Sequence, residues 1–491
     1  MFSTIRNNLF LRICIALAAV LPLFFIWTVL ATAPDLQDVF TAAAWWWAIV
    51  PLLLAAAGMW IPGRARWFGF GLFVAAFALK LAVALWTDAE PFSDFLTMYR
   101  AAEDLSRGGF DKTQAYWPYL LRWAYQTFFV AYEALILWLF PFGRASLLVA
   151  NALFMAGANV LLYALARMAL PERNARFAAL LYLFFLAPFF LAPVLTNQHV
   201  SLFFVLLGLY LLARGGKTWC FVAAGFFLAV GNALRPDALL LVLALLGALA
   251  LHLIDYIRAH SFHWKQLARE AKPVFLAAAT CWLAGVLLSG ASAVTGLNPN
   301  GLRNMNPEWK FVIGLNMETG GGFSRTLYDQ VFPTAADDPN DFIYPLETSR
   351  AVAKDIVRGH MRRSKSAMAD FLYQKTVRAW GFTESTSWAF QGMDERVTPL
   401  GEMTVEDAAA ILRPAERIYF AVICALAAVG IVMLCWQKDV PALLIVCGLT
   451  IVLFFGVHVL IEVQTRYKYF VMPFLFVLAG GVPSFIRRKG R

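Results

Sequence analysis

The chain has 491 residues, of which 61% are hydrophobic and only 15% are charged, whereas soluble domains carry about 25% charged residues. These values exclude an ordinary soluble protein and indicate an all-α polytopic membrane protein. The formal net charge of +10 would suggest a nucleic-acid partner in a soluble chain. Here the bases gather in short loops between apolar segments, so we expect a membrane and no nucleic acid.

The apolar segments follow one another along most of the chain. A membrane helix needs about 20 mostly apolar residues to cross the hydrocarbon core. The first such window ends at Ala31-Thr32-Ala33, which imitates a signal-peptidase site, but the following Pro34 predicts an uncleaved helix. About twelve windows predict transmembrane helices: 13–32, 41–60, 68–87, 146–166, 176–194, 199–213, 219–234, 238–254, 273–293, 416–436, 440–460 and 468–485.

The distribution of bases predicts which side each loop occupies. With a cytoplasmic N-terminus, the short inner connections and the tail 487–491 hold most of the Lys and Arg outside the long loops, while the short outer connections carry only Arg235, Arg466 and Lys468. This asymmetry follows the positive-inside rule. We therefore expect a multi-pass protein of the bacterial cytoplasmic membrane, with both termini inside.

Two long polar segments, 88–145 and 294–415, fall on the outer side. We divide the chain into two extra N-terminal helices (1–67), a transmembrane core (68–293), the outer segment 294–415, and C-terminal helices with a basic cytoplasmic tail (416–491). The aromatic stretch at 116–140 predicts helices in the interface, because Trp and Tyr favour the headgroup level. The apolar periodicity at 346–380 predicts a helix or a broken helix pair that rests on the membrane surface or on the transmembrane core.

Carboxylates and bases that could carry chemistry lie near the predicted outer surface. Asp88, Glu90 and Asp94 follow the third span, and Asp94 begins a short amphipathic helix that would hold it over the mouth of the bundle. The bases of this surface are Lys80, Arg235, Arg466 and Lys468. Singly, such bases are most often snorkelling side chains or ion-pair partners. Together, beside a carboxylate, they suit an anionic lipid headgroup, because Arg binds phosphate with a fixed fork of donors.

Short motifs in these segments resemble the GT-C superfamily of integral-membrane glycosyltransferases. They are Ser-Asp-Phe at 93–95 with Tyr99 and Ala101-Ala102, Arg-Pro-Asp at 235–237, and Glu462 with Arg466-Tyr467 and Pro473. The likeness covers roughly residues 68–485 and is greatest to bacterial relatives of the dolichyl-phosphate-mannose protein mannosyltransferases and to the aminoarabinose transferases. Two departures concern the acceptor: two extra helices precede the acidic loop, and Asp94-Phe95 stands where the protein mannosyltransferases have Asp-Glu.

The resemblance implies a GT-C fold whose first outer loop, 88–145, is catalytic. It implies that Asp94 is the base or acceptor-orienting group, and that Arg235, Arg466 and Tyr467 face the phosphate of a polyprenyl-phosphate-linked sugar. Lys80, Lys468, Glu90 and Tyr99 complete the expected substrate-binding set. The sugar would pass with inversion to a glycan, lipid or protein acceptor of the envelope, outside the membrane.

This chemistry agrees with the residues, because inverting transfer needs a base for the acceptor hydroxyl and a stabilised leaving phosphate. Two alternatives remain open. One is a transporter or flippase of an anionic lipid or polysaccharide intermediate, although transporters place their charges near the bilayer midplane. The other is an oligosaccharide polymerase or ligase with a diphosphate-linked donor.

We expect no cofactor and no metal. The six cysteines lie in or beside apolar runs without a CxxC pair, and Gly320-Gly321-Gly322 lacks the Lys-Ser/Thr of a nucleotide-binding loop. His260 and His263 lie in a basic loop, and Asp337-Asp338 is typical of a solvated turn. Divalent cations need several oxygen ligands together, so we expect metal-independent activity.

Overall fold

The computed structural model describes residues 4–6, 8–32, 42–87, 89–259, 263–333, 346–381 and 404–482. Within these ranges the chain is almost wholly helical, which confirms the predicted all-α class. The one sheet of the described part joins β1 (Thr4–Arg6) to β2 (Asp439–Pro441) in antiparallel register.

Seven helices of the described residues are long and apolar enough to cross a membrane. Each coincides with a predicted span, because an apolar run of this length forms a helix that satisfies all its backbone groups internally. They are α1 (Leu9–Ala31), α4 (Ala65–Thr87), α8 (Arg144–Ala169), α13 (Ala238–Ala259), α14 (Trp264–Val294), α20 (Val405–Leu434) and α21 (Ala442–Leu460).

The other predicted spans are shorter helices, so the total of about twelve stays a prediction. Apolar helices of 17 residues are α3 (Ala42–Gly58), α11 (Gln198–Arg214) and α12 (Thr218–Leu234). The window 176–194 is divided into α9 (Glu172–Leu183) and α10 (Leu186–Leu191). Pro188 explains the break, since proline cannot donate to the carbonyl four residues before it. The last window contains α22 (Met472–Ala479) and continues beyond the described residues.

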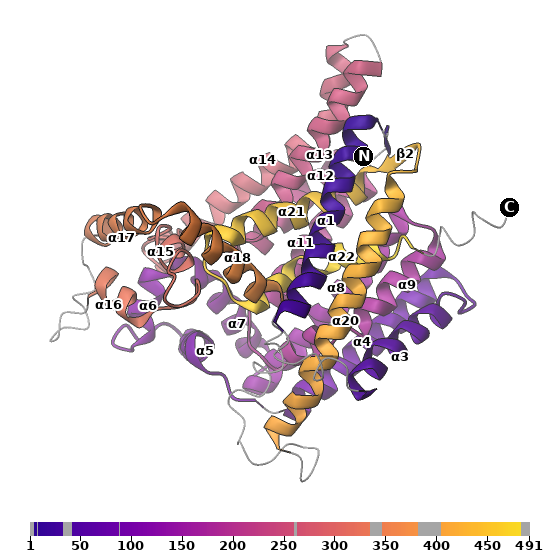
Figure 1. Ribbon diagram of the computed structural model, residues 1–491. Coiled ribbons are helices and arrows are strands. Elements are labelled where there is room, and N and C mark those ends of the chain that lie inside the picture. The colour runs from indigo at the N-terminus through magenta and orange to yellow at the C-terminus, as the bar shows by residue number, and fades with distance from the viewer. Residues whose placement is uncertain are drawn as a thin grey trace.

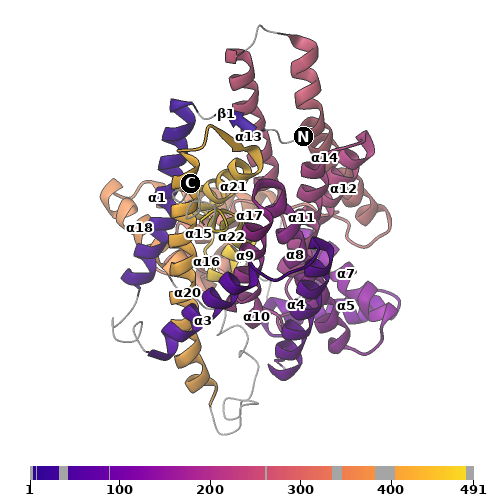
Figure 2. The same ribbon diagram turned by 90° about the vertical axis from the view of Figure 1, so that its right-hand side faces the viewer.

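Three segments that the sequence assigns to the cytoplasm lie together at one end of the molecule. β1 of the N-terminus pairs with β2, which follows α20. The backbone N–H of Arg6 donates to Asp255 Oδ2 at 3.1 Å, and Asp255 belongs to the α13–α14 hairpin that projects beyond the bundle (Figures 1 and 2). The predicted grouping of these loops on one side is thus present in the structure.

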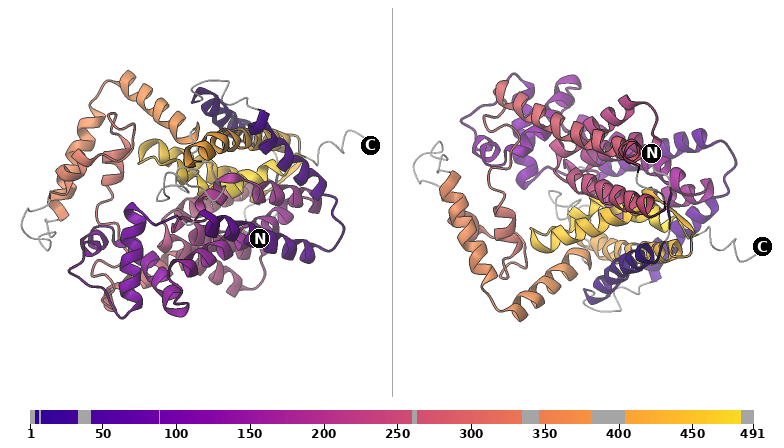
Figure 3. Two further views of the ribbon diagram at one scale, coloured as in Figure 1. Left: turned by 90° about the horizontal axis from the view of Figure 1, so that it is seen from below. Right: turned by 90° about the horizontal axis from the view of Figure 1, so that it is seen from above.

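The segments predicted to lie outside gather at another end, around the short helices of the two long loops (Figure 1). In both views of Figure 3, the orange arms α17 and α18 and the purple helices of the first loop lie at opposite sides of this end, with the yellow C-terminal segment between them. The elements are α5 (Ser93–Ser106), α6 (Tyr116–Arg122), η1 (Ala124–Gln126), α7 (Thr127–Leu139), α15 (Trp309–Gly314), α16 (Arg325–Val331), α17 (Leu346–Met361), α18 (Lys365–Gly381) and η2 (Thr465–Phe470).

A second, smaller hydrophobic core connects the two outer loops. It is separate from the main core of the bundle, and aromatic side chains dominate it. The Trp309 ring lies 5.4 Å from that of Phe332, and Trp123 of the first loop lies 5.6 Å from the same Phe332. This core fixes the position of α15, which carries residues of the candidate site. Its buried members are Trp123, Trp309, Val312, Ile313, Val331, Phe332 and Ala353.

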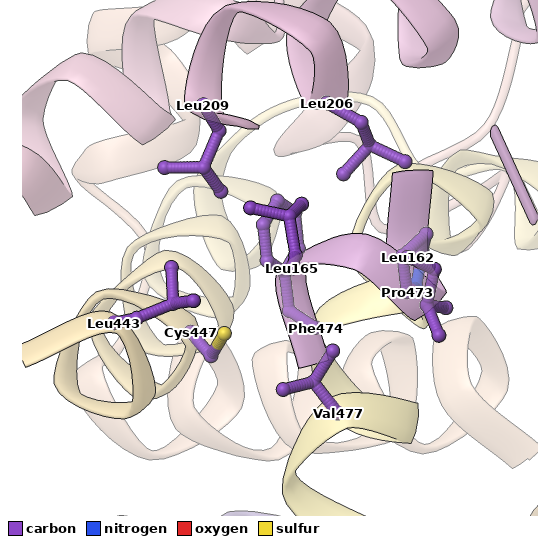
Figure 4. A pocket seen from close by; sticks show the side chains of 9 residues that line it. All are labelled: Leu162, Leu165, Leu206, Leu209, Leu443, Cys447, Pro473, Phe474 and Val477. Carbon is purple, nitrogen blue, oxygen red and sulfur yellow. The ribbon is translucent and has the colours of Figure 1, made fainter. Parts of the chain in front are cut away.

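An apolar cavity lies inside the bundle between α8, α11, α21 and α22. Figure 4 shows leucine, proline, phenylalanine, valine and cysteine side chains around it. Its volume is about 10 Å³, which is about the space that one water molecule needs. It is a packing void of the core, and it offers no polar group to a substrate.

Candidate functional site

Asp94 stands in the first turn of α5, directly after the third predicted span. A carboxylate is favoured there, because the positive end of the helix dipole faces it. Phe95 and Met98 are buried beneath the helix, and Asp94 itself is exposed. Ser93 has φ +50°, a left-handed conformation that side chains other than glycine rarely adopt, and such strain is often found at functional sites.

Arg466 of η2 lies beside Asp94. Its guanidinium carbon is 4.8 Å from the centre of the Phe95 ring, so the residue after Asp94 supports the base through a cation–π contact. Arg466 Nε also donates to Gln464 Oε1 at 2.6 Å. The arginine is thereby held by a ring contact and a hydrogen bond, and its charge acts on the Asp94 carboxyl.

A buried carboxylate, Glu462, joins the outer loops to the C-terminal segment. Lys310 Nζ of α15 and the Tyr467 hydroxyl both donate to Glu462 Oε2, the latter at 3.2 Å, and Gln464 Nε2 donates to Oε1 at 3.1 Å. Burial alone would raise the pKa of Glu462, but Lys310 and these hydrogen bonds outweigh it and lower that pKa. Glu462 is therefore held as an anion, and in turn it raises the pKa of Lys310 against the effect of burial.

Arg235 brings a third cation to the cluster. It follows α12, and its guanidinium carbon lies 4.7 Å from the centre of the Tyr467 ring. Its Nε donates to Asp237 Oδ2 and its Nη1 to Asn197 Oδ1 at 3.5 Å. Burial would lower the pKa of Arg235, but the charge of Asp237 offsets this and leaves the pKa raised. Arg235 and Arg466 thus both lie near Tyr467, whose ring centre is 5.7 Å from the Arg466 guanidinium carbon.

Opposing effects set the pKa of Asp94. The surrounding protein displaces water from its carboxyl, and this desolvation raises the pKa. The positive charges of Arg466 and Lys310 lower it, whereas Glu462 raises it further. Desolvation prevails, so the pKa of Asp94 lies above its ordinary value. A carboxylate with a raised pKa is a stronger proton acceptor, which suits a general base.

Two further residues, Tyr119 and Tyr125, lie near this constellation. We call the whole set the outer charge cluster: Asp94, Arg235, Lys310, Glu462, Arg466, Tyr467, Tyr119 and Tyr125. Burial raises the pKa of both added tyrosines, with Asp94 contributing to each. Sequence reasoning did not single out Lys310, Tyr119 or Tyr125, and it quoted Glu462 only as part of a motif. No local signal marks Lys310, because its partner Glu462 lies 152 positions away.

Two residues of the predicted set lie apart from this cluster. Five positions separate Tyr99 from Asp94, and in a helix of 3.6 residues per turn they face different sides. Burial and Glu103 raise the pKa of Tyr99 to about 12. The carboxylate of Glu90 is 73% exposed and lies 3.5 Å from Arg144 Nη1. Asp88 lies outside the described residues.

The two predicted lysines point into the protein. Lys468 is buried, its Nζ donates to the Trp380 carbonyl at 3.2 Å, and it lies 5.0 Å from the Phe420 ring centre. Lys80 belongs to α4 and is buried, and its Nζ lies 4.7 Å from the Phe189 ring centre. Within the described residues that Nζ has no hydrogen-bond partner. The structure does not bring either ammonium into the outer charge cluster.

The described ranges hold no group of three or more His, Cys, Asp or Glu that could bind a metal ion. Asp337-Asp338 and His260 lie outside those ranges, so the predictions for them stay open. The expectation of metal-independent activity likewise remains a prediction.

The chain was compared with protein families, curated sequences and solved structures. No family model and no curated protein sequence matches the chain. Its structure is similar to that of the Archaeoglobus fulgidus oligosaccharyltransferase in the apo form, with a TM-score of 0.42 and 15% identity over 87% of this chain and 51% of that chain.

Two further structures of oligosaccharyltransferase from that organism are similar to this chain. The one tethered to an acceptor peptide containing the NVT sequon gives a TM-score of 0.44 and 14% identity, over 87% of this chain and 50% of that chain. The complex of AglB with an inhibitory peptide and a dolichol-phosphate gives 0.41 and 13%, over 86% and 51%. The chain spans about half the length of these enzymes.

Proposed function

We propose that this chain is a membrane glycosyltransferase that moves a sugar from a polyprenyl-phosphate-linked donor to an acceptor hydroxyl, with inversion, on the extracytoplasmic face of a bacterial cytoplasmic membrane. The observation that carries the proposal is the outer charge cluster, where the Asp94 carboxylate lies beside the cations of Arg466 and Lys310, and Arg235 contacts the Tyr467 ring. These residues come from distant parts of the chain, and the helices α5 and α15, which carry Asp94 and Lys310, lie at the end of the bundle where the predicted outer loops gather (Figure 1).

Asp94 supplies the base of the proposed reaction. Attack on the anomeric carbon requires that the acceptor hydroxyl lose its proton, and a carboxylate within hydrogen-bond reach accepts it. Asp94 is exposed, so an acceptor from outside the protein has access to it. Its raised pKa increases its strength as a proton acceptor.

The leaving phosphate needs positive charge on the other side of the anomeric carbon. Arg466 and Arg235 both lie near the Tyr467 ring, and an arginine offers paired N–H donors to phosphate oxygens. Lys310 donates a hydrogen bond to Glu462. The negative charge of Glu462 therefore balances part of the positive charge of the cluster when no donor is bound. These fixed charges would stabilise the charge that develops on the phosphate as the glycosidic bond breaks.

The donor's chemistry also explains the membrane location. A polyprenyl tail is apolar, and helices next to the cluster expose large apolar side chains over much of their length. The lipid would lie against such helices while its phosphate meets the arginines. The acceptor is a glycan, a lipid or a protein of the envelope that carries a hydroxyl. We further propose that no metal takes part, because arginine and lysine provide the positive charge.

The proposal is tested by removing the negative charge of Asp94 while keeping its shape. In Asp94→Asn, turnover should fall by about 10²–10⁴-fold, the usual contribution of general acid–base help, while the purified protein in lipid discs keeps its thermal unfolding temperature. Transfer is measured from radiolabelled polyprenyl-phosphate sugars to envelope extract.

Glu90→Gln is the matched control, because Glu90 is an exposed carboxylate of the same loop that faces Arg144. It should retain most activity. An active Asp94→Asn beside an inactive Glu90→Gln would move the catalytic carboxylate to residue 90. Full activity in both variants would favour the transporter alternative.

A further inference from the structure

Lys375 is a buried lysine of α18 that lies behind the outer charge cluster. Lysine is almost never fully buried unless its ammonium is paired, and Lys375 is only 1% exposed. Its Nζ donates to the carbonyl oxygens of Gly314 at 2.6 Å, Val459 at 2.9 Å and Ile461 at 2.7 Å. An ammonium group has three N–H donors, so each of them has a carbonyl acceptor.

These carbonyls belong to the ends of two helices. Gly314 is the last residue of α15, and Val459 and Ile461 lie at the C-terminal end of α21. The last carbonyls of a helix have no partner within it, and they form the negative end of its dipole. A cation is therefore favoured at both ends, and the single ammonium of Lys375 joins α15 and α21 to α18.

The backbone around this ammonium is packed closely. A Cβ on Gly314 would lie 2.4 Å from the carbonyl carbon of Ile461, and a Cβ on Gly321, whose φ is +84°, would lie 2.8 Å from Lys375 Cδ. Only glycine permits these approaches. Two backbone hydrogen bonds lie next to these close approaches. The N–H of Glu462 donates to the Lys310 carbonyl at 3.0 Å, and the N–H of Val463 donates to the Gly321 carbonyl at 3.1 Å.

The segment held in this way leads directly into the cluster. Residue 461 accepts from Lys375, residue 462 is the buried carboxylate that binds Lys310, and residue 466 is the arginine beside Asp94. A displacement at Ile461 would therefore move an anion and a cation of the site together. The three hydrogen bonds of the Lys375 ammonium all end on backbone carbonyls, two of them at the end of α21, so its effect on the site would pass through that segment.

We propose that Lys375 is a positioning residue, whose ammonium sets the place of segment 461–466 and hence the relative positions of Glu462, Lys310 and Arg466. The inference rests on the proposed function, which gives the site its substrate. The contacts themselves do not depend on it.

The experiment uses the full chain in lipid discs and has two readouts. The first is hydrogen exchange of the amides in 462–467, and the second is the Kd of polyprenyl phosphate, used as the probe. Lys375→Met keeps the stem and removes the ammonium, so exchange in 462–467 should rise and probe binding should weaken, each about tenfold, as expected for lost charged hydrogen bonds. Lys375→Arg keeps the charge and N–H donors and should recover most of both effects.

Lys365→Met is the matched control, because Lys365 is an exposed lysine at the start of the same helix; both readouts should stay at wild-type values. Gly321→Ala would place a Cβ 2.8 Å from Lys375 Cδ. The Lys375 side chain must then shift, so this variant should reproduce the Lys375→Met pattern. It provides the test if Lys375→Met does not fold.

Unchanged exchange in 462–467 in Lys375→Met overturns the inference. So does raised exchange with unchanged probe affinity, or failure of Lys375→Arg to recover either effect, since Lys375 would then only stabilise the fold. If wild-type protein does not bind polyprenyl phosphate, the proposed function is overturned, and the exchange data alone decide the placement of segment 461–466.

Discussion

At the scale of single residues, the two arginines around Tyr467 should determine affinity for the donor. Replacing Arg235 or Arg466 by Ala removes a charge-assisted contact worth about 1.5–3 kcal/mol, so transfer should fall at least about tenfold. Arg107→Ala is the control, because Arg107 is 71% exposed and pairs only loosely with Glu103 and Asp104, at 3.8 and 3.9 Å. Donor KM and kcat of the three purified variants check this, and wild-type values for both Arg235→Ala and Arg466→Ala would contradict the phosphate role.

The pKa of Asp94 gives a second expectation at this scale. A general base works in its deprotonated form, so activity should fall as pH decreases through the pKa of Asp94. Desolvation raises that pKa, and Arg466 partly opposes the rise. The acid limb should therefore lie above the ordinary range of aspartate, about pH 3.9. In Arg466→Gln the opposing charge is absent, so the limb should move to still higher pH.

Profiles of kcat/KM against pH for the wild-type and Arg466→Gln proteins measure this shift. A limb that stays in place, or that moves to lower pH, would show that Asp94 and Arg466 do not interact in the working enzyme.

At the scale of elements, close contact between α12 and α14 depends on a glycine. A Cβ on Gly225 would lie 2.3 Å from the Ala277 carbonyl oxygen, so Gly225→Ala must push the two helices apart. Overpacking of this kind costs about 1–3 kcal/mol, and the thermal unfolding temperature in detergent should fall.

Gly285→Ala serves as the matched control for this change. Gly285 lies in α14, the helix that Gly225 of α12 contacts, but a Cβ there would meet nothing within 4 Å, so the unfolding temperature of Gly285→Ala should stay near that of the wild type. Equal unfolding temperatures for the two variants would mean that α12 and α14 are less closely packed than the structure indicates.

At the scale of the whole molecule, the grouping of loops at two ends predicts their accessibility. In a background without the six native cysteines, a Cys at Lys365 should react with a membrane-impermeant maleimide in intact cells. A Cys at Lys217, in the exposed connection between α11 and α12, should react only after lysis, because the excess of Lys and Arg places that connection inside. The reverse pattern would invert the proposed orientation.

The sequence by itself determined the membrane class, the seven long spans and the grouping of the loops. These features depend on local properties, since the length of an apolar run and the charge beside it are read directly from neighbouring residues. Asp94, Arg235 and Arg466 could be singled out for the same reason. Each stands in a polar connection next to a span, where an ionised side chain is conspicuous.

Only the tertiary structure decided which of these residues meet. Tyr99 faces away from Asp94 because of the rotation of α5, and the Lys468 ammonium turns toward Trp380 although its residue lies two positions from Arg466. Lys310 joins Glu462 across 152 positions, and Lys375 binds carbonyls of segments far from it in the chain. Such contacts depend on how helices pack and which face each presents, and the order of residues in the chain does not encode this locally.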